Sequence, residues 1–222
     1  MAVYDLEEQE QIENLKAWWQ KYGNRLTLLL CAIAIASISW QSWRWYQNKQ
    51  SGEAGVLYAN LGQAIAQDEA DQVRRLGGEL SKRYGSTDFA PIGIMLSAKY
   101  YVLKGDLETA KVQLLWVAEH DGHELADLAR LRLAGILLDE KDYAGALREL
   151  AHKPAAAFAA AYAELEGDIG VEQGEPEKAK AAYQKALELR KADLREAGAQ
   201  DENAVEIAFP ILRQKLDALG GA

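Results

Sequence analysis

The feature that most constrains this chain is a stretch of 18 residues, Leu26 to Trp43, without a charged side chain. At 1.5 Å per residue, a helix of this length just crosses the roughly 30 Å hydrocarbon core of a bilayer. Aromatic side chains, which favour membrane interfaces because an apolar ring carries a polar N–H or O–H, flank both ends. They are Trp18, Trp19 and Tyr22 on one side and Trp40, Trp43 and Trp45 on the other. We therefore predict a transmembrane helix over residues 25–46 rather than the core helix of a soluble protein.

The residues before this helix argue for an anchor that is not cleaved. The apolar run is preceded by 25 residues that begin with an acidic stretch, whereas the leader of a signal peptide is short and basic. A small-x-small pattern, Ala34 to Ala36, falls inside the apolar run instead of after it. Three basic residues precede the run and two follow it closely, which slightly favours a cytoplasmic N terminus. We predict an acidic cytoplasmic segment over 1–24 and a translocated domain over 47–222.

Composition excludes several classes of protein. A formal net charge of −9 and a pI near 5.0 argue against a nucleic-acid binder, which needs a basic face. The single cysteine, Cys31, lies inside the apolar run, so the chain has neither a disulfide framework nor a four-cysteine metal site. We expect no cofactor.

Residues 47–222 contain a repeated helical pattern. Three similar stretches, 104–111, 141–147 and 173–180, each combine a short turn with the start of a helix, and another helical pattern precedes each one. Their equivalent alanines, Ala110, Ala146 and Ala179, are 36 and 33 residues apart. A helix pair repeating at this interval predicts a helical solenoid, whose units bury their apolar faces by stacking.

The best unit has the spacing of a tetratricopeptide repeat, with small residues where two helices cross and an aromatic residue between them. Its departures are Ala163 where the pattern has Trp and Lys191 where it has Pro. An earlier degenerate unit is predicted over 54–81, with Val73 at the alanine position. The residues predicted to pack the repeats are Ala110, Ala146, Gly167, Gly174, Ala179, Tyr183 and Ala186.

The predicted fold class is therefore all-α: one N-terminal transmembrane helix, a tetratricopeptide-like helical solenoid and a C-terminal capping helix. The cap is expected over 203–219, where apolar residues recur with helical spacing. Pro210 should bend this segment or start a second piece of it.

An acidic N-terminal tail, the motif Trp18-Trp19-x-x-Tyr22-Gly23, one span and a divergent tetratricopeptide domain together resemble the YfgM family. Its members are ancillary subunits of the bacterial SecYEG translocon. The resemblance implies an inner-membrane anchor, a cytoplasmic N terminus and a periplasmic helical domain. It also implies a membrane-anchored chaperone of the peptidyl-prolyl isomerase type, PpiD, as a partner, and a role in passing secreted chains to periplasmic chaperones.

A tetratricopeptide array binds partners on the face lined by the first helix of each unit. The residues predicted to line this face are apolar in the first units and acidic in the last: Ile92, Met95, Lys99, Val102, Leu128, Leu131, Leu138, Glu164, Asp168 and Glu172. An apolar groove with an acidic end suits an amphipathic helix or an extended chain. The alternative is that its leucines only pack against neighbouring helices. The Lys/Asn clamp by which some tetratricopeptide adaptors hold a C-terminal carboxylate is missing, and Glu164 with Asp168 would repel one.

The sequence offers little for catalysis. His120 and His123, in the run His-Asp-Gly-His-Glu, are the one candidate pair of metal ligands, but a turn around Gly122 would not align them. No catalytic or metal-binding residue is predicted. We therefore expect a non-enzymatic interaction protein. The alternatives are a scaffold for envelope assembly or stress signalling that also uses the cytosolic tail, and, third, a metal-dependent enzyme.

Overall fold

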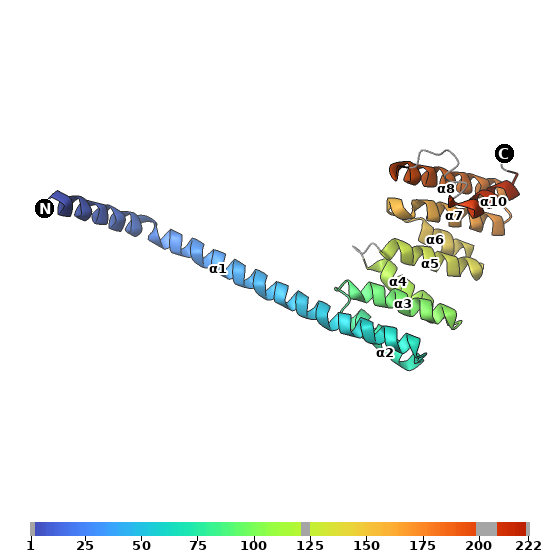
Figure 1. Ribbon diagram of the computed structural model, residues 1–222, viewed down its shortest axis with the longest axis horizontal. Coiled ribbons are helices and arrows are strands. Elements are labelled where there is room, and N and C mark those ends of the chain that lie inside the picture. Colours follow the sequence, from blue (N-terminus) through green and yellow to red (C-terminus); the bar gives the residue numbers. More distant parts are fainter. Residues whose placement is uncertain (1–2, 121–124, 199–207, 221–222) are drawn as a thin grey trace. The chain divides into compact units, whose positions relative to one another are not determined.

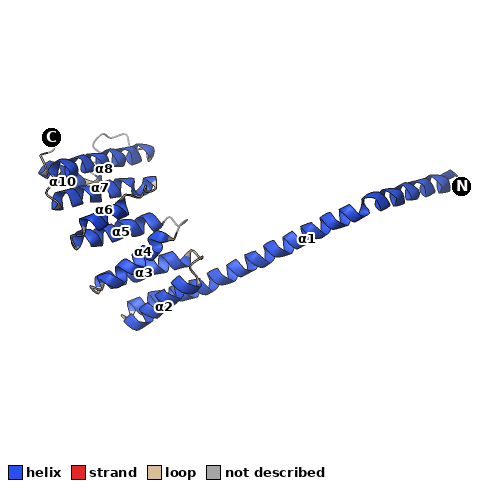
Figure 2. Ribbon diagram, turned by 180° about the vertical axis from the view of Figure 1, so that it is seen from behind, coloured by secondary structure: helices blue, strands red, loops and turns tan. Residues whose placement is uncertain are grey.

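The computed structural model describes residues 3–120, 125–198 and 208–220. Every regular element in these residues is a helix, which confirms the predicted all-α class (Figures 1 and 2). The helices are α1 (Val3–Ala66), α2 (Ala70–Arg83), α3 (Phe89–Leu103), α4 (Leu107–Glu119), α5 (Leu125–Asp139), α6 (Tyr143–Leu150), α7 (Ala156–Glu172), α8 (Pro176–Glu196) and α10 (Pro210–Ala218).

The chain divides into two compact units, residues 1–53 and residues 54–222. The first unit is the N-terminal part of α1, and it contains an 18-residue window of mean hydropathy 1.6 with no residue buried by the protein. The helix is therefore long and apolar enough to cross a membrane. All six predicted interface residues lie on its surface, with exposed fractions of 39% to 67%; these are Trp18, Trp19, Tyr22, Trp40, Trp43 and Trp45.

The helix of the first unit does not end where the sequence pattern places the end of the span. Residue 47 was predicted to begin a separate domain, but α1 continues without interruption to Ala66. No proline lies between these positions, and isolated glycines such as Gly52 and Gly55 weaken a helix without ending it. The last turns of α1, from Ala54, belong to the second unit.

In its described residues the second unit contains four helix pairs followed by α10, and a turn of one type joins the two helices of each pair. The pairs are residues 54–66 of α1 with α2, α3 with α4, α5 with α6, and α7 with α8. Two residues after the end of each first helix lies a residue with positive φ, and these residues are 37, 36 and 33 apart: Asp68, Gly105, Lys141 and Gly174. In every turn the next N–H donates to the carbonyl five residues earlier, at 2.8–2.9 Å. This Schellman geometry satisfies the end of one helix and starts the next.

The predicted alanine positions lie at the centre of each pair. Val73, Ala110, Ala146 and Ala179 follow the positive-φ residue by five positions, and each is 0% exposed. The core is made of three successive clusters, and helices such as α5 and α7 contribute residues to two of them. Stacking between neighbouring units therefore holds the array together.

One glycine of the last pair, Gly174, has a role that differs from the prediction. Gly174 was expected where helices cross, but it is exposed, and a Cβ there would meet no atom within 4 Å. Its φ of +72° shows that it forms the left-handed turn instead. The close crossing lies at Gly170, where a Cβ would come within 3.0 Å of the Ala179 backbone nitrogen. Gly167 lies against the ring of Tyr183, as a crossing residue would.

The last helix, α10, covers the end of the array. Leu212 and Leu216 are 2% and 5% exposed, and they belong to the core cluster of α7 and α8. The structure starts this helix at Pro210, in agreement with the expected second piece. Residues 203–207 of the predicted cap lie outside the described residues.

Candidate partner-binding site

We define the inner row as the residues predicted to line the binding face: Ile92, Met95, Lys99 and Val102 on α3; Leu128, Leu131 and Leu138 on α5; Glu164, Asp168 and Glu172 on α7. Ile92 is 42% exposed, and Lys99 is exposed as well. Met95 and the three leucines are half-buried, and Met95, Leu131 and Leu138 pack against the core. These side chains therefore pack between helices and keep an accessible edge.

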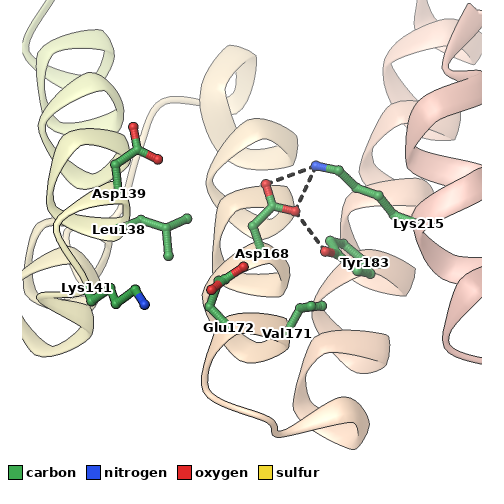
Figure 3. Close-up of a pocket in the computed structure, with 8 residues that line it drawn as sticks. All are labelled: Leu138, Asp139, Lys141, Asp168, Val171, Glu172, Tyr183 and Lys215. Atoms are coloured by element: carbon green, nitrogen blue, oxygen red, sulfur yellow. Dashed lines mark hydrogen bonds and ion pairs between the residues drawn. The ribbon is translucent and has the colours of Figure 1, made fainter.

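The sequence pattern suggests that the acidic end of the inner row is open. In the structure it is not open, because Lys215 of α10 lies on it. The Lys215 ammonium is 3.0 Å from Glu164 Oε1 and 2.7 Å from Asp168 Oδ1. The Tyr183 hydroxyl donates to Asp168 Oδ1 at 2.7 Å, and the Lys215 ammonium is 5.7 Å from the centre of the Tyr183 ring (Figure 3). The cap of the array thus places one positive charge between the two carboxylates that were expected to repel a C-terminal carboxylate.

The contacts within this cluster shift the pKa values of Lys215 and Tyr183. Burial by itself would lower the pKa of Lys215, but its hydrogen bonds to Asp168 and Glu164 outweigh burial and raise that pKa. Burial, together with the hydrogen bond to Asp168, raises the pKa of Tyr183. Both groups therefore stay protonated in the folded protein at any physiological pH.

Removing the lysine charge should loosen α10. In Lys215→Met the carboxylates of Glu164 and Asp168 stay partly buried without a cation. Because all three side chains are 27–30% exposed and water screens them, we expect a loss of about 1 to 2 kcal/mol. Hydrogen exchange of the α10 amides should speed up accordingly. The matched control Lys185→Met removes the exposed Lys185–Glu166 pair and should change exchange little.

The same cluster predicts a loss of stability at alkaline pH. The folded state raises the pKa of Lys215 above its ordinary value of 10.5, so the charged lysine stabilises the fold at lower pH. This contribution is lost as pH rises through the folded pKa. The difference in melting temperature between wild type and Lys215→Met should therefore be constant from pH 7 to 10 and shrink above about pH 10.5. A difference that grows above pH 10.5 would contradict the assignment.

A cavity of about 400 Å³ opens beside this cluster, between α5, α7, α8 and α10 (Figure 3). Leu138 of α5 and Val171 of α7 give it two apolar walls. Its charged groups come from each side: Asp139 and Lys141 at the end of α5, Asp168 and Glu172 on α7, and Lys215 on α10. The inner row therefore ends in a mixed cavity rather than in a purely acidic surface.

Sequence reasoning missed four residues of this site: Asp139, Lys141, Val171 and Lys215. Lys215 meets carboxylates 47 and 51 positions earlier, a separation that no local pattern reveals. The sequence did contain a signal for Lys215. Two carboxylates one turn apart, on a helix that faces a cap, need a positive charge nearby. Lys141 occupies a left-handed turn position, where glycine is more usual, so its place at the rim follows from the turn.

The histidines of the candidate metal pair are described only in part. The His120 ring stacks on Trp116 with centroids 3.7 Å apart, and its Nδ1–H donates to the Trp116 carbonyl at 2.8 Å. His123 lies outside the described residues. Among the described residues, no three or more His, Cys, Asp or Glu side chains are grouped to hold a metal ion.

Comparison with known proteins adds to this geometry. The model of a tetratricopeptide repeat-like domain matches residues 16–221. A protein of Neisseria gonorrhoeae named ancillary SecYEG translocon subunit is 30% identical over 99% of this chain and 100% of its own length. Proteins of the same name from Haemophilus influenzae and Escherichia coli are 27% and 25% identical, each over 83% of this chain, with 90% and 88% of their own lengths matched.

Proposed function

The chain belongs to the family of ancillary SecYEG translocon subunits with a tetratricopeptide repeat-like domain, and from this membership we propose that it is a non-enzymatic interaction protein held beside the Sec translocon. The observation that carries the proposal is the end-to-end match to the Neisseria gonorrhoeae subunit, which includes both the anchor and the solenoid. A match confined to the repeats would support only a binding domain.

The proposed task is to hold a polypeptide on the inner row near the site of translocation. Accessible apolar edges at Ile92, Met95 and Leu131 suit the apolar face of a helix or an extended chain. The thioether of Met95 adapts to varied side chains. The polypeptide is either a secreted chain leaving the translocon or a membrane-anchored periplasmic chaperone of the PpiD type, to which the secreted chain is passed.

The proposed topology follows the family resemblance and the charge distribution. Residues 1–24 lie in the cytoplasm, residues 25–46 form an uncleaved span, and residues 47–222 lie in the periplasm. A C-terminal alkaline phosphatase fusion tests this topology, because the enzyme is active only after export. An inactive fusion, or a mature chain shortened by the mass of the N-terminal segment and the span, would overturn it.

Association with the translocon is tested by purification from native membranes. We expect SecYEG subunits to co-purify with the tagged full chain in a mild detergent. The matched control joins residues 1–53 to an unrelated soluble domain, which keeps the anchor and removes the solenoid. If the anchor alone recovers as much SecYEG as the full chain, the solenoid makes no contact with the translocon. If neither protein recovers SecYEG, the proposed function is wrong.

A further inference from the structure

The cavity at the end of the inner row carries a charge imbalance that its own residues leave unsatisfied. Three carboxylates and two ammonium groups line it. Lys215 is committed to Asp168 and Glu164. Within the described residues, Asp139, Glu172 and Lys141 form neither a hydrogen bond nor an ion pair through their side chains. Two carboxylates thus face one lysine, and the excess charge at this place is negative.

The walls of the cavity determine what kind of cation fits. In Figure 3 the side chain of Leu138 extends from α5 into the space toward α7, and Glu172 points into the same space, with Val171 beside it. Glu172 and Asp139 are exposed beside these apolar side chains, so a cation that reaches either carboxylate lies next to an apolar surface. Lysine and arginine side chains have this shape, because an aliphatic stem carries the charged group at its end.

The chain itself contains an example of a lysine side chain bound in this way, Lys215 of α10. α10 packs on the last helix pair and places Lys215 so that its ammonium reaches carboxylates of α7. This ammonium also lies 5.7 Å from the centre of the Tyr183 ring. The inner face of α7 therefore already binds one lysine side chain that comes from another segment of the same molecule.

We propose that this cavity binds one lysine or arginine side chain of a polypeptide docked on the inner row. The stem lies between Leu138 and Val171, and the charged group meets Glu172, while Asp139 adds negative potential at the rim. This inference rests on the proposed function, since it states which segments the inner row selects: apolar stretches that carry a basic residue. Lys141, at the same rim, opposes the binding of a cation.

Designed peptides test the proposal with the full-length chain in phosphatidylcholine nanodiscs. The probes are acetylated and amidated 11-residue peptides of Ala, Leu and Ser that differ only at the central residue, which is Lys, Arg, norleucine or Glu. Norleucine keeps the aliphatic stem without the charge. A photoreactive benzoylphenylalanine at Leu131 reports docking by its crosslinking yield. We expect half-maximal crosslinking at an about fivefold lower concentration for Lys and Arg than for norleucine.

Three variants assign the preference to the cavity. Glu172→Gln should bring the lysine-to-norleucine ratio close to one. Lys141→Gln should raise the ratio, because it removes the competing cation. Glu177→Gln is the matched control, since Glu177 is an exposed carboxylate on α8 outside the cavity, and it should leave the ratio unchanged.

The outcomes separate this inference from the proposal on which it rests. Peptides that crosslink equally well with Lys and norleucine would overturn the selection of a cation and leave docking on the inner row intact. A preference that survives Glu172→Gln would place the cation elsewhere and overturn the assignment. Peptides that do not crosslink at all would overturn both the inference and docking on the inner row.

Discussion

Replacing Ala179 with tryptophan should lower the free energy of unfolding of the helical domain by about 3 kcal/mol. Ala179 is 0% exposed, at the crossing of α7 and α8. The space beside it is closed, since even a methyl group built on Gly170 would lie 3.2 Å from the Ala179 Cβ. An indole can enter only if the two helices separate, and this separation also disturbs the core cluster that holds α10. Urea unfolding followed by circular dichroism measures the change.

The control for this prediction is the same substitution two residues later. Ala181 lies on the same helix and is exposed, so Ala181→Trp adds an equal volume without entering the crossing. It should change the unfolding free energy by less than about 0.5 kcal/mol. Equal urea midpoints for the two variants would mean that α7 and α8 do not cross at Ala179, and the repeat register would be wrong.

A single aspartate at the centre of the apolar run should have the second large effect. In Ala34→Asp a carboxylate lies in the middle of the bilayer, which disfavours insertion by about 3 kcal/mol. The run of 18 uncharged residues is close to the shortest that spans, so it has little apolar surplus to offset this cost. We expect much of the chain to move from the membrane pellet to the supernatant on extraction with alkaline carbonate.

Ala59→Asp controls for the added charge, because Ala59 is an exposed residue of the same helix beyond the apolar run. This variant should stay in the pellet as the wild type does. If Ala34→Asp also stays in the pellet and resists extraction fully, the segment around Ala34 does not lie in the hydrocarbon core.

Features set by neighbouring residues could be predicted from the sequence. The apolar helix needs only the run without charges and its aromatic borders, and both are local. The repeats also depend on short patterns: a left-handed residue, a helix start and an alanine five positions on, as at Gly105 and Ala110. Even the degenerate first unit keeps this order, because Asp68 takes the left-handed conformation and Val73 fills the alanine position.

Features set by contacts between distant residues could not be predicted. The close crossing lies at Gly170 and not at Gly174 because of where α8 crosses α7, which a repeat consensus locates only to within one turn. The pairing of Lys215 with Glu164 and Asp168 depends on how the cap packs. The apolar part of the candidate site and the carboxylates of α7 were therefore predicted, because they follow the helix period, whereas the lysines at the charged end were missed.

Site-specific photocrosslinking in native membranes tests the central claim most directly, namely that a membrane-anchored solenoid holds polypeptides on its inner row. A benzoylphenylalanine at Met95 or Leu131 samples the inner row, and one at Val112 samples an exposed apolar position on the second helix α4. We predict that Met95 and Leu131 crosslink to secreted chains or to a membrane-anchored chaperone, and that Val112 does not. Crosslinks to these partners from Val112 alone, or equally from all three positions, would contradict this account.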